Sequence, residues 1–501
     1  MSPARRTRGS DINTLARLRA VLTSPTLLRL GARLNFDQPV GRPPVHPPYV
    51  LLAYGTLARL ARSGVRVEYD LTESATWKMA RELLVTATAD LGLDVPPPGR
   101  RPPRWDHWRW IRDHYLTTDE GLAQLGREYP AVAADLARSL GLCRTDGPGT
   151  LTHPDRTRCV YGDGTLVRPI YAPPETVEIT LDDGTRQKRY PDPRTGELHE
   201  QPLHRYDPDL QPHHGRLGPV LTHGYVAWHV RGPKPYQRVV LAVDHVSAPG
   251  QEAATSVRLA GEVHRHLGHG VQAAIYDGAM HGVHIEHLMR RYGWLVLAKT
   301  PAAGAPETGI EKPLFVNHAG KRQRSYPLGF HTHDTPAGSC RHQLAALDGA
   351  VVEIDLDDNG DPVVVDRLER GAVKRSRRAT GEYHFNIGYR IPCPREPCTT
   401  WLSPHPGRRN DTGRPHNIRI IAESDPDFAH LYGLRNDAEN FHSNLKRTLI
   451  VDRAMSLGWR RGLIDIYCYA LLNNALAEHQ AARALTSSNT TLTRVRRHYS
   501  S

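Results

Sequence analysis

The sequence has no long apolar run. Its most apolar helical stretch, around residues 463–472, is short and contains Asp465, whereas a membrane-spanning helix needs about 20 apolar residues. Cysteine is also scarce, with 6 residues in a chain of 501, which excludes a fold held together by a disulfide framework. The basic first residues are not followed by the apolar segment of a signal peptide. We therefore expect a soluble, cytoplasmic protein without a membrane partner.

The composition is that of a globular protein with an excess of basic charge. Apolar residues make up 39% of the chain, and its length is sufficient for two or three domains with cores. Lys+Arg number 65 against Asp+Glu 53, which gives a formal net charge of +12 at pH 7. Such an excess favours a polyanionic partner, because basic side chains that neutralise phosphates release counterions. Charge alone does not establish nucleic-acid binding.

The spacing of apolar residues divides the chain into five segments. Helical spacing dominates the beginning and the end, whereas short apolar runs between turn residues dominate the middle. We expect a helical N-terminal DNA-binding domain, the first part of a catalytic domain, a β-rich insertion, the C-terminal helices of the catalytic domain and a flexible tail. These segments correspond to residues 1–150, 151–300, 301–425, 426–485 and 486–501.

Residues 151–300 predict a mixed α/β sheet. We expect strands at CVYGDGTLV, YVAWHVRG and RVVLAVDHV, a helix at EAATSVRLAGEVHRHL, a strand at AAIYDGAM, a helix at HIEHLMRRYG and a strand at WLVLAKTP. Between the first two strands, VEITLDDGTRQKRY is typical of a hairpin with Asp-Gly at its turn. This order of elements is that of a ribonuclease H-like sheet. The predicted fold class is therefore α/β, with a β-rich insertion and a preceding helical domain.

A segment rich in arginine and tryptophan ends the N-terminal region. In RWDHWRWIRDHYL, Arg104, Arg109 and Arg112 alternate with tryptophans, and arginine beside aromatic rings can hold a DNA backbone. The same pattern fits a helix that packs its tryptophans inward and leaves its arginines in solvent, which is the interpretation that we favour. The three arginines remain candidate DNA contacts.

The segment LYGLRNDAENFHSNLKRTL carries the most informative pattern. On a helix with about 100° per residue, one narrow stripe holds an aromatic hydroxyl, two cations and a carboxylate: Tyr432, Arg435, Lys446 and Glu439. Beside the stripe runs an apolar face that we expect to be buried, formed by Leu434, Ala438, Phe441 and Leu445. His442 lies near the stripe and is a candidate DNA contact, although a solvated histidine is the favoured interpretation.

Asp163 and Asp277 complete a candidate catalytic site with Glu439. Both aspartates fall near the ends of predicted strands, and carboxylates from separate elements must converge to hold the two divalent ions, about 4 Å apart, that serve phosphoryl transfer. Oxygen ligands suit Mg²⁺ or Mn²⁺. Each aspartate alone also fits a turn, because each precedes glycine, and Glu439 alone fits an ion pair with Arg435. The occurrence of all three acids in this order along the chain favours catalysis by them. The other stripe residues would then bind DNA phosphates.

The spacing Tyr432-x2-Arg435-x3-Glu439-x6-Lys446 resembles the Tyr-Arg-Glu-Lys fingerprint of the insertion-sequence-four family of DDE transposases. YGDGTLV and IYDGAM resemble the strands that carry that family's catalytic aspartates. The resemblance spans most of the chain and implies metal-dependent cleavage of transposon ends and strand transfer into target DNA. It also implies a bacterial, nucleoid-associated protein that binds double-stranded DNA with terminal inverted repeats as a homodimer. Two features depart from the family pattern: GAMHGVH after Asp277, and the long insertion at about 170–220.

Two other functions stay open at this point. A ribonuclease H-like nuclease of the same fold would cleave DNA without joining it. A domesticated DNA-binding protein would keep the fold without catalysis, although the complete set of acids argues against it. Asp244, at the end of the third predicted strand, is a distant fourth candidate for the catalytic carboxylate.

Two further groups of residues have candidate roles. Trp401 and Trp294 are candidates for stacking a flipped base, and we favour Trp401 because Trp294 lies in an apolar strand. Several residues of the insertion could supply the four nitrogen or sulfur ligands of a structural zinc ion: Cys393, Cys398, His331, His333, Cys340 and His342. Because these residues span some sixty positions in a chain with 28 histidines, chance clustering is the favoured interpretation.

Overall fold

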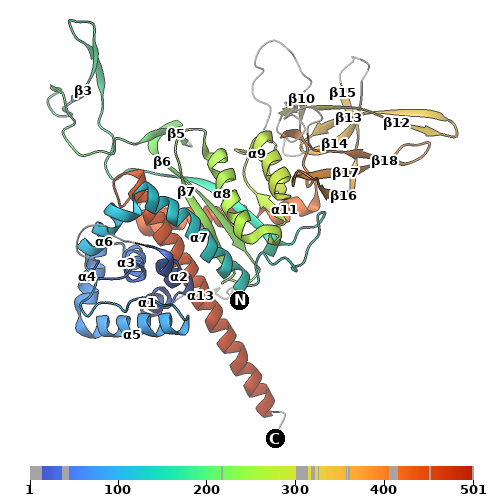
Figure 1. Cartoon of the computed structure of the whole chain (residues 1–501). Helices are drawn as coiled ribbons and strands as arrows, with labels where there is room; N and C mark the ends of the chain where they lie inside the picture. Colours follow the sequence, from blue (N-terminus) through green and yellow to red (C-terminus); the bar gives the residue numbers. More distant parts are fainter. Residues whose placement is uncertain are drawn as a thin grey trace, which may run out of the picture.

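A mixed sheet lies at the centre of the protein, with helices from both ends of the chain against it and β-rich segments that project away (Figure 1). The computed structural model describes residues 14–35, 44–215, 218–300, 314–316, 322–324, 326–356, 358, 362–405, 416–450 and 453–498. Among these residues, no helix is both long enough and apolar enough to cross a membrane.

The N-terminal part is helical, as the sequence predicts. Capping residues begin its helices: the Ser24 and Thr118 side chains accept hydrogen bonds from the backbone N–H groups of Leu27 and Gly121. Every residue of α3 from Tyr49 to Arg59 is buried, so this helix is the centre of the N-terminal part. The elements are α1 (Thr14–Leu22), α2 (Pro25–Arg33), α3 (Pro48–Ala61), α4 (Gly64–Thr72), α5 (Ser74–Asp90), α6 (Trp105–Ile111) with a π-helical turn (Arg112–Leu116), and α7 (Asp119–Ser139).

The central sheet contains the strands that the sequence predicts for residues 151–300. β1 (Cys159–Val167) pairs antiparallel with β6 (Gly218–Arg231), which pairs antiparallel with β7 (Arg238–Val246). On its other side β1 pairs parallel with β8 (Ala273–Ile275), which is parallel to β9 (Leu295–Leu297). β5 (Gln211–Gly215) pairs with the first residues of β6. Helix α8 (Glu252–Leu267) joins β7 to β8, and α9 (Gly282–His287) with a π-helical turn (Leu288–Tyr292) joins β8 to β9.

The excursion after β1 forms the predicted hairpin. β2 (Val177–Thr180) and β3 (Arg186–Pro191) pair antiparallel, and β4 (Leu198–His199) adds to β3. Gly184 occupies the turn with a φ of 78°, a left-handed conformation that glycine adopts without strain. This arm extends away from the sheet (Figure 1).

The predicted insertion is β-rich. Its strands form antiparallel sheets in the orders β10-β11, β12-β13-β14-β15 and β16-β17-β18. Trp401 lies in β18. The strands are β10 (Leu314–Val316), β11 (Arg322–Arg324), β12 (Tyr326–Thr335), β13 (Gly338–Leu347), β14 (Ala350–Leu356), β15 (Pro362–Arg367), β16 (Glu369–Arg377), β17 (Tyr383–Ile391) and β18 (Cys398–Leu402).

The C-terminal helices differ from the prediction in two respects. The single helix expected around Glu439 is α11 (Pro426–Tyr432) followed by α12 (Arg435–Asn444) and a π-helical segment (Leu445–Ile450), because the hydrogen bonds change at Gly433 and Leu434 to ones that span three residues. Helix α13 (Trp459–His498) continues through the expected flexible tail as far as His498, since extending a formed helix requires no new nucleus. Residues 499–501 of the predicted tail lie outside the described residues.

Helix α13 ties the N-terminal helices to the sheet. Asn474, fully buried, accepts a hydrogen bond from Val240 N at 2.9 Å and donates to Val240 O at 3.0 Å and to Tyr129 Oη at 3.1 Å. These bonds satisfy backbone groups of β7 and link it to α7 through α13. One hydrophobic core extends from the N-terminal helices through the sheet to α13.

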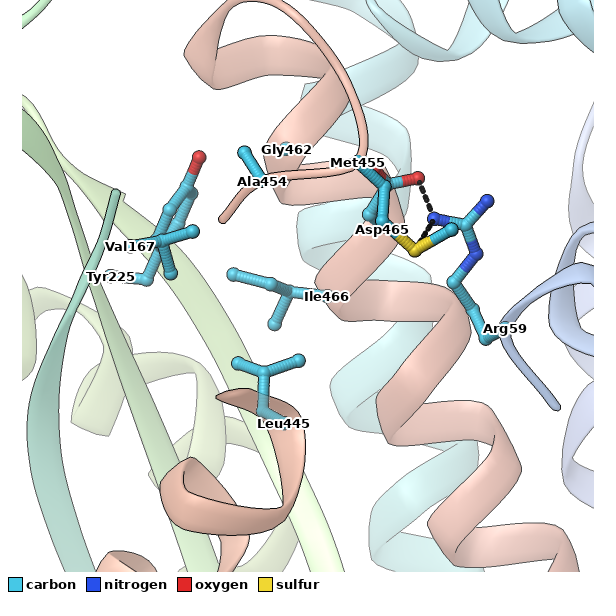
Figure 2. Close-up of a pocket in the computed structure, with 9 residues that line it drawn as sticks. All are labelled: Arg59, Val167, Tyr225, Leu445, Ala454, Met455, Gly462, Asp465 and Ile466. Atoms are coloured by element: carbon cyan, nitrogen blue, oxygen red, sulfur yellow. Dashed lines mark hydrogen bonds and ion pairs between the residues drawn. The ribbon is translucent and has the colours of Figure 1, made fainter. Parts of the chain in front are cut away.

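A buried ion pair joins α3 to α13 beside the sheet. Figure 2 shows Arg59 of α3 and Asp465 of α13 next to a small cavity with mostly apolar lining. Their closest atoms, Arg59 Nη1 and Asp465 Oδ1, are 2.8 Å apart, and the side chains are 2% and 13% exposed. Arg59 also contacts Met455 Sδ at 3.4 Å.

Candidate metal centre

Asp163 lies within β1 and not at its end. It stands opposite Ala227 of β6, but the parallel pairing of β1 with β8 stops at Tyr161. β1 thus extends past its parallel neighbour, and Asp163 is in that extension. Tyr276 alone separates Asp277 from the end of β8. The two aspartates therefore lie at the same end of the parallel pair, the position that the prediction requires.

The glycines beside Asp163 make room for neighbouring side chains. A Cβ on Gly164 would lie 2.3 Å from Glu252 Cδ, and a Cβ on Gly162 would lie 2.8 Å from the Tyr276 ring. Any larger residue at either position would displace a side chain of the site. The Gly-Asp-Gly sequence is thus part of a closely packed strand, and the turn that Asp163-Gly164 also fits is absent.

Asp163, Asp277 and Glu252 form the carboxylate cluster of this site. One carboxylate oxygen from each residue lies within 4.8 Å of the others. Tyr276 Oη donates a hydrogen bond to Glu252 Oε1 at 3.0 Å and holds it in place. The sequence does not identify Glu252 as a site residue, because acidic residues are common in the first turn of a helix, where they interact favourably with the helix dipole. Its only signal is its position at the start of the helix after the third strand.

Arg435 brings the three predicted catalytic acids together. Its Nη2 lies 3.3 Å from Asp163 Oδ1 and 3.8 Å from Asp277 Oδ2, and its Nη1 lies 2.9 Å from Glu439 Oε1. The Glu439 side chain is 54% exposed, whereas that of Asp163 is 11% exposed. Glu439 therefore lies at the rim of the site, and Glu252 is the glutamate that clusters with the aspartates.

The electrostatics of the cluster favour a bound cation. Burial raises the pKa of Asp163 to about 6, against the opposing effect of Arg435. Burial, and after it the nearby Asp277 carboxylate, raise the pKa of Glu252 to about 7. Buried carboxylates that repel one another are stabilised in their charged form by a divalent ion. An all-carboxylate donor set suits Mg²⁺ or Mn²⁺.

Comparison of the chain with protein-family models, with curated proteins and with solved structures found no match. The chemistry of the site is therefore inferred from its own residues and their geometry.

We expect Glu252→Gln to stabilise the metal-free protein at neutral to alkaline pH. The pKa of Glu252 rises from 4.5 to about 7 on folding, so the folded state favours the protonated form. In the wild-type protein, the contribution of this raised pKa to stability is fully present below pH 4.5 and is lost as the pH rises through 7. Glutamine stays neutral and should raise the free energy of unfolding by about 1–3 kcal/mol near pH 8, with little effect near pH 4. Urea unfolding in EDTA measures the difference, and an equal effect at both pH values would contradict the raised pKa.

The remaining stripe residues are only partly available to a ligand. Tyr432 is half-buried and stacks on Phe428, with ring centres 4.8 Å apart, and burial raises its pKa to about 12. Lys446 is half-buried in the π-helical segment. The prediction that one ideal helix aligns all four residues is wrong at both ends, since the helix breaks after Tyr432 and changes its winding at Leu445.

His442 is buried and not solvated. Its ring packs against Phe441 and His229, and burial lowers its pKa to about 3. The expectation of a solvated histidine is wrong, and so is its assignment as a DNA contact. The cause is a wider buried face than the apolar pattern predicts. Leu434, Ala438, Phe441 and Leu445, in α12 and directly beside its ends, are buried as predicted, and His442 is buried with them.

The predicted arginines of the N-terminal region differ in exposure. Arg104 and Arg109 are exposed, and Arg104 pairs with Glu68 at 3.3 Å. Arg112 is buried, where its Nε donates to Asp113 Oδ1 at 2.8 Å and its Nη1 to Ser456 Oγ at 3.3 Å. The assignment of Arg112 as a DNA contact is therefore wrong, because this side chain connects the π-helical turn to the segment before α13.

Trp108 is fully buried, as predicted for the tryptophans of α6, but Trp110 is 37% exposed. Trp294 is fully buried in the core, in agreement with the interpretation that we favoured. Trp401 is 43% exposed, and Lys374 Nζ lies 4.1 Å from the centre of its ring. Asp244 forms an ion pair with Arg258 at 2.7 Å and is not a member of the carboxylate cluster.

Proposed function

We propose that the chain is a DNA transposase that cleaves and joins phosphodiester bonds with divalent metal ions at Asp163 and Asp277. The observation that carries this proposal is the convergence of Asp163, Asp277 and Glu439 on Arg435 from β1, the end of β8 and α12. The strand order β7-β6-β1-β8-β9, antiparallel on one side of β1 and parallel on the other, supports a ribonuclease H-like fold. The Tyr-Arg-Glu-Lys spacing supports a transposase within that fold.

The carboxylates fit Mg²⁺ or Mn²⁺ by their chemistry. Asp163 and Asp277 would hold the ions from the sheet, Glu252 from the start of α8, and Glu439 from the rim. When bound, such ions activate an attacking hydroxyl or water and stabilise the leaving oxygen. The chain itself provides the converging oxygens, and their partial burial strengthens every charge interaction within the site.

Basic side chains beside the acids provide contacts for a phosphate backbone. Arg435 presents a planar guanidinium that can form paired hydrogen bonds with phosphate oxygens. Lys299 Nζ lies 5.5 Å from the centre of the Tyr432 ring, which adds positive charge beside this residue. A DNA phosphate bound beside the acids would contact Arg435, which also contacts the carboxylates. Arg435 can therefore position the DNA relative to the acids.

Two glutamine variants distinguish the roles of Glu252 and Glu439. We expect Glu252→Gln to raise the Mg²⁺ concentration needed for cleavage about 10–100-fold, because Glu252 clusters with both aspartates. Glu439→Gln should lower the cleavage rate even at saturating Mg²⁺. Glu262 lies on the same helix α8 and pairs with Arg265. Glu262→Gln is the matched control and should change neither the Mg²⁺ requirement nor the cleavage rate. Unchanged cleavage in Glu439→Gln would show that this residue is not catalytic.

The proposed function is tested with DNA taken from both flanks of the coding region. This DNA contains the terminal inverted repeats. Protein, Mg²⁺ and this DNA are incubated with a supercoiled target plasmid, and the products are separated on denaturing gels. Joined products support transposition. Cleavage without joining indicates a nuclease, and a mobility shift without cleavage indicates a DNA-binding protein, and either result would overturn the proposal.

A further inference from the structure

A second group of metal-ligating side chains lies in the β-rich insertion, separate from the carboxylates. The β12–β13 register places His331 opposite His342 and His333 opposite Cys340. Residues directly opposite each other, and those two apart on one strand, share a face of the sheet. Four metal-ligating side chains are thus on one face of this hairpin. The β17–β18 connection brings Cys393 to the same place.

The donor atoms of this group converge on one point. His333 Nε2 and His342 Nε2 are 3.3 Å apart, and two nitrogens bound to one tetrahedral zinc ion at 2.0–2.1 Å are separated by about 3.3 Å. A ligand atom of Cys393 lies within 4.8 Å of both histidines. The Cys393 thiol also forms hydrogen bonds with His333 and Cys340. Two imidazole nitrogens and the Cys393 sulfur therefore converge, and the Cys340 thiol lies beside Cys393.

Neighbouring groups hold these donors in a metal-binding form. Glu353 Oε1 of β14 lies 2.7 Å from His342 Nδ1, which fixes the tautomer that leaves the Nε2 lone pair directed at the cluster. The backbone N–H groups of Glu396 and Arg395 donate to the Cys393 sulfur. The thiolate is the form of cysteine that binds metals.

We propose that His333, Cys340, His342 and Cys393 bind a structural zinc ion. Four protein ligands complete a tetrahedral shell and leave no position for a substrate, so the ion has a structural role. The ion connects the β12–β13 hairpin to the loop before β18, and thereby one sheet of the insertion to the other. Arg395 Nη1, which donates to Ala337 O at 3.3 Å, makes a second link between the same two segments.

The hairpin needs such a link because it has little core of its own. No residue of β12 is buried, and the burial of β13 begins only at His342. The buried apolar residues of this sheet, Ala345, Leu347, Val352 and Ile354 in one cluster and Leu344, Ala346 and Val351 in the main core, all lie outside β12 and beyond His342 in the chain. Small units with so few buried apolar residues depend on a disulfide or a metal for stability. The cysteines described are free thiols.

The test measures the zinc content of the full chain in the absence of DNA, so its result is independent of the proposed transposase activity. We expect one zinc ion per chain after purification without chelator. Replacement by Co²⁺ should give the visible bands of a tetrahedral site and a thiolate-to-cobalt charge-transfer band. Cys393→Ser and His342→Asn should lose more than nine-tenths of the bound metal. In wild-type protein, chelation should increase amide hydrogen exchange at residues 333–340 with little change in β17.

Cys398→Ser, at the start of β18 directly after the loop that holds Cys393, is the matched control. Cys398 Sγ lies 3.6 Å from His331 Nε2, and neither residue belongs to the proposed set, so this variant should keep its zinc. Loss of zinc in Cys398→Ser but not in Cys340→Ser would overturn the proposed ligand set. Absence of bound zinc or cobalt in wild-type protein given excess metal, or a disulfide between Cys340 and Cys393, would overturn the site itself.

Discussion

Asp163→Asn is expected to lower Mg²⁺-dependent DNA cleavage by about a thousandfold. Asp163 is the most buried carboxylate of the predicted triad and lies next to both Asp277 and Arg435. A metal ion at such a site contributes several kcal/mol of transition-state stabilisation, and each 1.36 kcal/mol corresponds to about a tenfold change in rate. Asparagine retains the shape of the side chain but not the charge that holds the ion. Single-turnover cleavage of labelled DNA ends measures this loss.

The variant should remain folded and should still bind DNA. The pKa of Asp163 is raised to about 6 by burial, so a neutral side chain costs the metal-free protein little stability at neutral pH. Asp244→Asn is the matched control, because Asp244 is also on a strand of the sheet but pairs with Arg258 outside the cluster. Equal cleavage by Asp163→Asn and wild type would exclude Asp163 from catalysis.

Asp465→Ala is expected to lower the free energy of unfolding by about 3–5 kcal/mol. The substitution leaves Arg59 charged and buried at the junction of α3, α13 and the sheet, where its side chain is 2% exposed (Figure 2). Removal of one partner from a buried ion pair has this large cost because the remaining charge has neither water nor a counterion. Urea unfolding followed by circular dichroism measures the change.

An exposed pair of the same part of the chain provides the control. Arg66 and Asp70 form an i, i+4 pair at 3.0 Å with side chains 65% and 47% exposed, and Asp70→Ala should cost no more than about 0.5 kcal/mol. The double variant Arg59→Met with Asp465→Leu should recover most of the stability that Asp465→Ala loses, because apolar residues can replace a buried pair. A similar small effect of Asp465→Ala and Asp70→Ala would contradict the burial of the pair.

Local sequence patterns predict the central elements well. β1, β7 and α8 begin and end where the apolar runs and the helical spacing place them, because each element is defined by its own period of buried residues. Asp163 and Asp277 come together because Asp163 lies in β1 and Asp277 closely follows the end of β8, the parallel strand beside β1. The prediction is less accurate for α11 and α12, because one ideal helix cannot represent the break at Gly433 and the π-helical segment.

Local sequence patterns do not predict contacts between residues that are far apart in the chain. Glu252 joins the acids only because Gly164 lets it approach β1, and no local signal marks that contact. Arg112 and His442 look like surface side chains but are buried by α13 and the sheet. The zinc ligands depend on the register of β12 with β13 and on a loop more than fifty positions away. The sequence contains all of these residues, but only the fold shows which of them meet.

Manganese binding measured by electron paramagnetic resonance tests the carboxylate site most directly. Titration of Mn²⁺ into metal-free protein near pH 8 should show saturable binding, which Mg²⁺ displaces. The double variant Asp163→Asn with Asp277→Asn should lose this binding, whereas Asp244→Asn should retain it. Equal Mn²⁺ binding by the double variant and the wild-type protein would contradict a divalent metal centre at these acids, and with it the proposed chemistry.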